Sequence, residues 1–149
     1  MTPSQKSLVR QTFAQVVPIA DQAAALFYGR LFELDPSLRP LFKNDLRAQG
    51  QKLMQMIGYA VGKLDAPEEL VPAVEGLGVK HVGYGVKDAD YTTVGAALLW
   101  TLQKGLGPAF TPDVEAAWAA AYAALSGMMM KGATTAGRSP ASRSAPGPG

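Results

Sequence analysis

Residues 77–86 read LGVKHVGYGV, and the interpretation of the whole chain depends on this stretch. It contains His81, the only histidine among 149 residues, in a chain without cysteine. Glycines lie in or beside the stretch at positions 76, 78, 83 and 85. Each costs roughly 1 kcal/mol relative to alanine in a helix interior. Local helix propensity is therefore overridden beside His81, as is typical of functional sites.

The stretch belongs to a pattern with helical spacing. Apolar residues and the histidine follow one another at intervals of four and three residues, at Leu70, Val74, Leu77, His81 and Tyr84. This spacing places all of them on one face of a helix that opens near Asp65. His81 is therefore predicted to point in the same direction as the apolar side chains.

Similar patterns predict helices elsewhere, over residues 3–17, 19–34, 36–42, 46–64, 91–106 and 112–131. Capping signals precede several of the seven helices, among them Thr2, Asp35, Asp65 and Thr111. No stretch alternates with the period of two that is typical of strands. We therefore predict an all-α fold of about seven helices in one domain, residues 1–133, followed by a disordered Gly/Pro/Ser-rich tail, residues 134–149.

The charge distribution argues against nucleic-acid binding. The net charge is +2, but Arg138 and Arg143 lie in the acid-free tail, so acids and bases balance over the first 133 residues. No signal peptide or membrane-spanning stretch is expected, since no apolar run is long enough. The absence of cysteine permits a reducing compartment, and we expect a cytoplasmic protein that is a monomer or a homodimer.

A lone histidine on an apolar helix face is more often a hydrogen-bonded core residue than a ligand. Among functional readings, a zinc site needs three or four ligands, which one histidine and no cysteine make improbable. No GxSxG turn or phosphate-binding loop is present. Haem is the metal cofactor that needs one protein ligand, because the porphyrin supplies the other four nitrogens. Tyr28, Gln49 and Leu53 are suitable residue types for the opposite wall of such a pocket.

Three motifs together resemble one family. They are LFYGRLF at residues 26–32, DPSLRPLF at residues 35–42, and LGVKHVGYGV followed by Tyr91 ten residues after His81. The chain resembles a single-domain bacterial globin related to the haem domain of flavohaemoglobins, over roughly residues 4–131. The resemblance implies a globin fold around one pocket that holds haem b, iron protoporphyrin IX.

The resemblance also implies a role for each matching residue. His81 matches the proximal iron ligand, and Tyr28 and Gln49 match the distal pair that contacts the gas. Lys80 matches a lysine near a haem propionate. The other residues expected to contact the haem are Phe42, Leu53, Tyr84, Val86, Tyr91 and Val94.

Two features depart from the family pattern. Flavohaemoglobins have a glutamate in the last helix that joins a network with the histidine and the tyrosine matching Tyr91. Its position falls at about Ala133 here, and Glu115 is the only glutamate in the last predicted helix. The chain also ends without the flavin and nicotinamide domains, so any turnover is expected to need an external electron-donating reductase.

The resemblance therefore predicts a haem protein that binds dioxygen and other diatomic gases reversibly at a five-coordinate ferrous iron. With a reductase, nitric oxide dioxygenase activity is expected. One alternative is a non-catalytic protein that binds, stores or scavenges oxygen, nitric oxide or sulfide. A second alternative is a haem-free helical interaction domain.

Overall fold

The computed structural model describes residues 1–42, 45–83 and 86–136, and the regular structure within them is entirely helical. These residues form six α-helices and three short 3₁₀ helices, in the order α1 (Pro3–Val16), η1 (Val17–Ile19), α2 (Ala20–Leu34), η2 (Pro36–Leu41), α3 (Leu46–Gly62), α4 (Pro67–Gly83), α5 (Asp88–Leu106), η3 (Gly107–Ala109) and α6 (Pro112–Ala136). The predicted all-α fold is confirmed. The seven predicted helices correspond to the six α-helices and η2.

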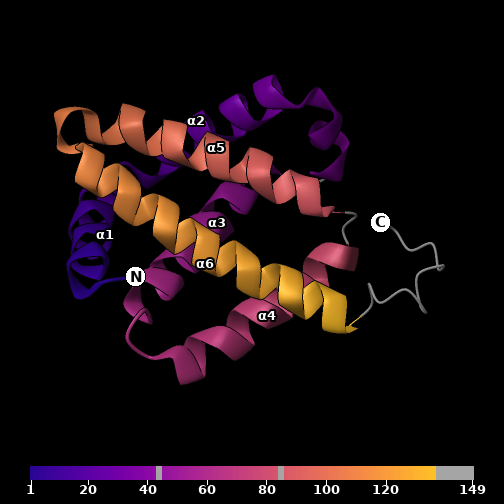
Figure 1. The fold of residues 1–149 in the computed structure, drawn as a ribbon. Helices are drawn as coiled ribbons and strands as arrows, with labels where there is room; N and C mark the ends of the chain where they lie inside the picture. Colours follow the sequence, from indigo (N-terminus) through magenta and orange to yellow (C-terminus); the bar gives the residue numbers. More distant parts are fainter. Residues whose placement is uncertain (43–44, 84–85, 137–149) are drawn as a thin grey trace.

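The helices pack in crossing pairs rather than as a parallel bundle (Figure 1). The main pairs are α4 with α6, α2 with α5, α1 with α6 and α2 with α3. The largest apolar cluster lies where α1, α2, α3, α5 and α6 meet, and consists of Val9, Val16, Ala23, Val61, Leu102, Leu106, Val114, Ala117, Trp118 and Ala121. Burial of these faces removes apolar surface from water and supplies most of the stabilisation.

One buried hydrogen bond joins the first and last helices through this core. The Trp118 Nε1–H donates to Thr12 Oγ1 at 2.8 Å, and the Thr12 hydroxyl donates to the Leu8 carbonyl at 2.7 Å. A buried indole N–H without an acceptor would cost about 1–3 kcal/mol. Thr12 therefore allows Trp118 to be buried to 3% exposure.

Three of the four predicted caps are confirmed. Thr2 forms a reciprocal capping box with Gln5, while Asp35 accepts from the Ser37 N–H and Thr111 from the Val114 N–H. The prediction for Asp65 is wrong. The first-turn N–H groups of α4 bond instead to the Ala66 carbonyl.

The Asp65 carboxylate is used to tie α1 to the turn before α4. It accepts from Lys6 Nζ at 3.1 Å and from Arg10 Nη2 at 2.6 Å, and these two cations lower the pKa of Asp65.

Two helix ends differ from their predicted positions. α5 begins at Asp88, three residues earlier than expected, where the Lys87 N–H donates to the Asp90 carboxylate at 2.9 Å. α6 continues past Gly132 to Ala136 and so includes the first three residues assigned to the tail. The division at residue 133 stays a prediction. None of the described helices has the length and apolar character needed to cross a membrane.

Candidate haem pocket

His81 lies near the end of α4 and is half-buried. Its Nδ1 atom is 2.6 Å from the carbonyl oxygen of Leu77, one helical turn earlier. A carbonyl oxygen can only accept, so Nδ1 must carry the proton and donate it. In the neutral ring the lone pair then lies on Nε2, the form that coordinates a metal. The backbone hydrogen bond also fixes the orientation of the ring, as the second shell of a metal site does.

Four other predicted site residues, from separate parts of the chain, come together. Tyr28 from α2, Phe42 after η2, Leu53 from α3 and Val94 from α5 belong to one apolar cluster, although they are far apart in sequence. The Tyr28 and Phe42 rings meet edge to face with centroids 5.3 Å apart. This cluster provides apolar walls of the type that a porphyrin needs.

Phe32 is a member of this cluster that the sequence analysis did not identify. Its ring is 5.5 Å from Phe42 and 6.1 Å from Tyr28, measured between centroids. Its position four residues after Tyr28 in α2 was the available signal, because side chains at that spacing share a helix face.

The Tyr28 side chain is buried, with 5% of its surface exposed. Burial raises the pKa of Tyr28 to about 12, because the phenolate would lose its hydration. The hydroxyl is therefore protonated at neutral pH and able to donate. It forms no hydrogen bond with any residue that the structure describes, and it is not fully enclosed by them. A buried donor in this state fits a polar ligand atom supplied from outside the chain.

Gly50 brings α3 close to α2 beside Tyr28. A Cβ atom at this glycine would lie 2.7 Å from the Ala24 Cβ and 3.7 Å from the Tyr28 ring. Gln49 precedes Gly50 and is half-buried, and the described residues show no hydrogen bond between Gln49 and Tyr28. The distal role of Gln49 stays a prediction.

Tyr91 from α5 lies on the histidine side of the site. Its ring centroid is 6.2 Å from that of His81, with the two planes inclined at 49°. The Tyr91 carbonyl accepts a 2.6 Å hydrogen bond from the Tyr122 hydroxyl of α6. Burial, and to a smaller extent repulsion from Tyr91 when its phenol is ionised, raises the pKa of Tyr122 well above its usual range. Tyr122 supports the backbone of Tyr91, a role that the sequence analysis did not identify.

The remaining predicted residues are less informative. The Val86 N–H donates to the His81 carbonyl at 3.0 Å, so Val86 is held next to the histidine, whereas Lys80 is exposed. Tyr84 lies outside the described residues. Ala133, at the position where the resemblance implies a glutamate, is buried with 1% exposure. Within the described chain, no three side chains of His, Cys, Asp or Glu gather as a metal site would require.

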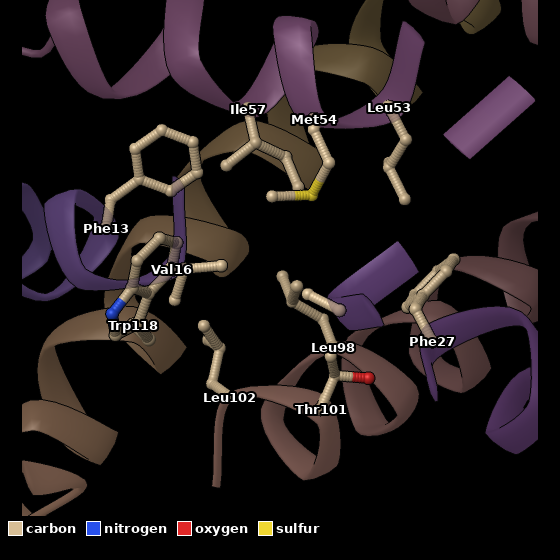
Figure 2. A pocket seen from close by; sticks show the side chains of 11 residues that line it. Phe13, Val16, Phe27, Leu53, Met54, Ile57, Leu98, Thr101, Leu102 and Trp118 are labelled. Carbon is tan, nitrogen blue, oxygen red and sulfur yellow. The ribbon is translucent and has the colours of Figure 1, made fainter. Parts of the chain in front are cut away.

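A small cavity of about 20 Å³ lies between α1, α2, α3, α5 and α6 (Figure 2). Leu53, Phe27 and Leu98 line it and also belong to the cluster around Tyr28. Two lining side chains carry polar groups that are already bonded: the Thr101 hydroxyl donates to the Ala97 carbonyl at 2.8 Å, and the Trp118 indole N–H donates to Thr12 Oγ1 at 2.8 Å. A cavity of this size could hold one water molecule, but water needs two or more polar partners. The cavity therefore suits a small apolar molecule better than water.

The amino-acid sequence of the chain is similar to those of known proteins. The family model for globins matches residues 25–129, a range that contains Tyr28, Phe42, His81 and Tyr91. The chain belongs to the globin family. Flavohemoproteins from Bordetella parapertussis and Bordetella bronchiseptica are each 33% identical to this globin over 134 residues, which is 87% of this chain and 33% of the relative.

A third flavohemoprotein, from Bordetella pertussis, is 32% identical over the same extent. This globin therefore spans about a third of the length of these relatives. Membership in the globin family supports haem-based binding of gaseous ligands as its class of function.

The buried tyrosine predicts a loss of stability in alkali. In the unfolded chain Tyr28 ionises near pH 10, whereas in the folded chain it keeps its proton to about pH 12. The unfolded state binds fewer protons between these values, so the contribution of Tyr28 to folding is complete below pH 10 and is lost as the pH rises toward 12, at about 1.4 kcal/mol per pH unit.

We expect Tyr28→Phe to reduce the fall in unfolding free energy between pH 9.5 and 11.5, measured by chemical denaturation. The fall should not vanish, because the pKa of Tyr122 is raised as well. Tyr59→Phe is the matched control, since Tyr59 is 39% exposed. An identical pH dependence in Tyr28→Phe and wild type would contradict this prediction.

Proposed function

We propose that this globin holds haem b through His81 and binds dioxygen and other diatomic gases reversibly in a pocket between α4 and the cluster around Tyr28. When bound, haem supplies a ferrous iron with an open coordination position for a diatomic gas. The observation that carries the proposal is the His81 ring, which a backbone carbonyl holds in the tautomer that coordinates a metal.

Several residues are proposed to hold the macrocycle. Phe42, Leu53 and Val94 offer apolar surface to it, and their packing against one another is supported by the cluster around Tyr28. Tyr91 is proposed to steady the proximal side, because its ring lies next to His81. Val86 and Tyr84 complete the proposed contacts. Lys80 is exposed and can reach a propionate at the surface.

Tyr28 is proposed as the donor to the gas. Its side chain is buried and its hydroxyl stays protonated without a partner among the described residues, so it can donate without first breaking a bond to the protein. A hydrogen bond to a partly anionic ligand contributes roughly 1.5–3 kcal/mol. That magnitude corresponds to about ten- to a hundred-fold slower release of the gas. Gln49 is proposed to complete the polar side of the pocket.

Slow release of dioxygen suits nitric oxide dioxygenation better than rapid oxygen delivery. In the net reaction, dioxygen, nitric oxide and one electron give nitrate. The apolar cavity behind Leu53 favours small apolar molecules near the site, which supports a reaction between two gases. The names of the relatives indicate a flavin beside the haem, and we propose that a flavin reductase outside these 149 residues supplies the electron.

The proximal side favours a second candidate, a protein that binds or scavenges oxygen, nitric oxide or sulfide without turnover. A carboxylate partner makes a ligating histidine more basic. Here the orienting partner of Nδ1 is a backbone carbonyl, and the position implied for the glutamate is Ala133. We propose a cytoplasmic protein, monomeric or homodimeric, for either function.

His81→Gly tests the haem proposal itself. Wild-type protein mixed with haem should show a Soret band that shifts on addition of carbon monoxide. The variant should lose most of its haem affinity, and imidazole in solution should restore the five-coordinate spectrum in part. Val79→Ala, at an exposed position of the same helix with no proposed role in the site, should keep the wild-type spectrum. A wild-type protein without a Soret band would favour the haem-free interaction domain.

Tyr28→Phe tests the proposed donor. We expect dioxygen to dissociate about ten- to a hundred-fold faster from this variant in stopped-flow measurements, because one charge-assisted hydrogen bond is lost. Tyr59→Phe should leave the rate unchanged. An unchanged rate in Tyr28→Phe would exclude the hydroxyl from ligand binding.

Nitrate formation separates the enzyme from the binder. With NAD(P)H, a flavin reductase and both gases present, continuous nitrate production over many equivalents of haem is the outcome expected of a dioxygenase. A single burst of one nitrate per haem would instead indicate a scavenger that is not returned to its ferrous form.

A further inference from the structure

We infer that Gly78 and Gly132 are positioning residues for His81, because direct contact between the backbones of α4 and α6 fixes the place of the histidine ring. This inference rests on the proposed role of His81 as the haem ligand. It adds two residues whose only contribution is the absence of a side chain. The two helices cross in Figure 1, and α6 is the main packing partner of α4.

The contact is made at two points, one helical turn apart on each helix. A Cβ atom added at Gly78 would overlap the backbone carbonyl group of Met129, and one added at Gly132 would overlap that of Glu75. Both glycines are buried. In each case the obstacle is backbone, which cannot rotate away as a flexible side chain can. Alanine at either position therefore requires the helices to move apart.

The first contact is linked directly to the histidine. The peptide group between Leu77 and Gly78 is planar, so the Leu77 carbonyl and the Gly78 Cα atom move as one rigid unit. The Leu77 carbonyl is also the acceptor of the His81 Nδ1 proton, at 2.6 Å. A short chain of rigid links thus runs from the α6 backbone at Met129, through the Leu77–Gly78 peptide, to the imidazole ring.

Side-chain packing around the crossing keeps the two helices pressed together. Leu70 and Val74 of α4 are buried to 2% and 1% exposure, and the partly buried Leu125, Met128 and Met129 of α6 pack against them. This apolar cluster supplies attraction, and the two glycines decide how close the backbones come. Interiors are packed densely enough that such a distance cannot relax freely.

The test compares Gly78→Ala and Gly132→Ala with Gly76→Ala and Gly127→Ala in the full, haem-loaded chain. Each control glycine lies in the same helix as its partner but has nothing within 4 Å of its added Cβ. The readouts are the iron–histidine stretching band of the ferrous protein and the nuclear Overhauser contact between the His81 and Tyr91 rings in the carbon monoxide complex. Because His81 is the only histidine, both signals are unambiguous.

We expect Gly78→Ala and Gly132→Ala to shift the stretching band and to weaken the Overhauser contact several-fold, while both controls match wild type. Coincident signals in all five proteins would overturn the inference. Met129→Ala provides a second test if neither glycine variant folds. This variant loses side-chain packing but keeps the backbone contact, so its stability should fall while its band stays in place; a shifted band would show that the side chain positions His81 and would overturn the inference.

The outcomes also distinguish this inference from the proposed function. If wild type takes up no haem, the proposed function fails, yet the Overhauser contact between His81 and Tyr91 can still be compared among the variants. If wild type binds haem and gas normally but the glycine variants keep the wild-type signals, only the positioning role fails.

Discussion

The site depends on one constraint, the direct contact between the backbones of α4 and α6. α4 carries His81, and α6 is the element against which it mainly packs. α6 in turn is anchored to α1 through Trp118 and to α5 through the hydroxyl of Tyr122. The position of α4, which carries the histidine, is therefore fixed mainly by its packing against α6. α5 joins the two halves of the site, because Tyr91 lies beside His81 while Val94, three residues later, packs in the cluster around Tyr28.

Much of the fold could be predicted from the sequence, because helix spacing and caps are local signals. The caps at Thr2, Asp35 and Thr111 form as expected, and the all-α fold follows from the spacing of apolar residues. The failures have non-local causes. Asp65 is a good cap in isolation, but Lys6 and Arg10 reach it from a helix more than fifty residues earlier. Gly132 suggests a helix end, yet its contact with α4 places it in the interior of α6.

The same reasoning explains what could be predicted of the site. His81 stands out by composition alone, and Tyr28, Phe42, Leu53 and Val94 follow from the resemblance and do come together. Phe32 and Tyr122 were missed because their roles depend on contacts with other parts of the fold. Phe32 packs against Tyr28 and Phe42, and Tyr122 donates to the Tyr91 carbonyl. Gly76 and Gly78 show most clearly what could not be predicted from the sequence. They are two residues apart and equivalent by any local measure, but one is exposed and the other meets the backbone of a residue about fifty positions later. The two glycines differ only because α6 packs against Gly78 and not against Gly76.

The hydrogen bond between Thr12 and Trp118 has a consequence for the order in which this globin can assemble. Its two partners are 106 residues apart, and the apolar cluster around them likewise joins α1 to α5 and α6. A chain is synthesised from its N-terminus, and domains fold as units. α1 is therefore made first, but its buried face is fully covered only after α6 has been made. Until then Val9 and Val16 lack the packing that α6 supplies, and the core closes only once Trp118 has emerged from the ribosome.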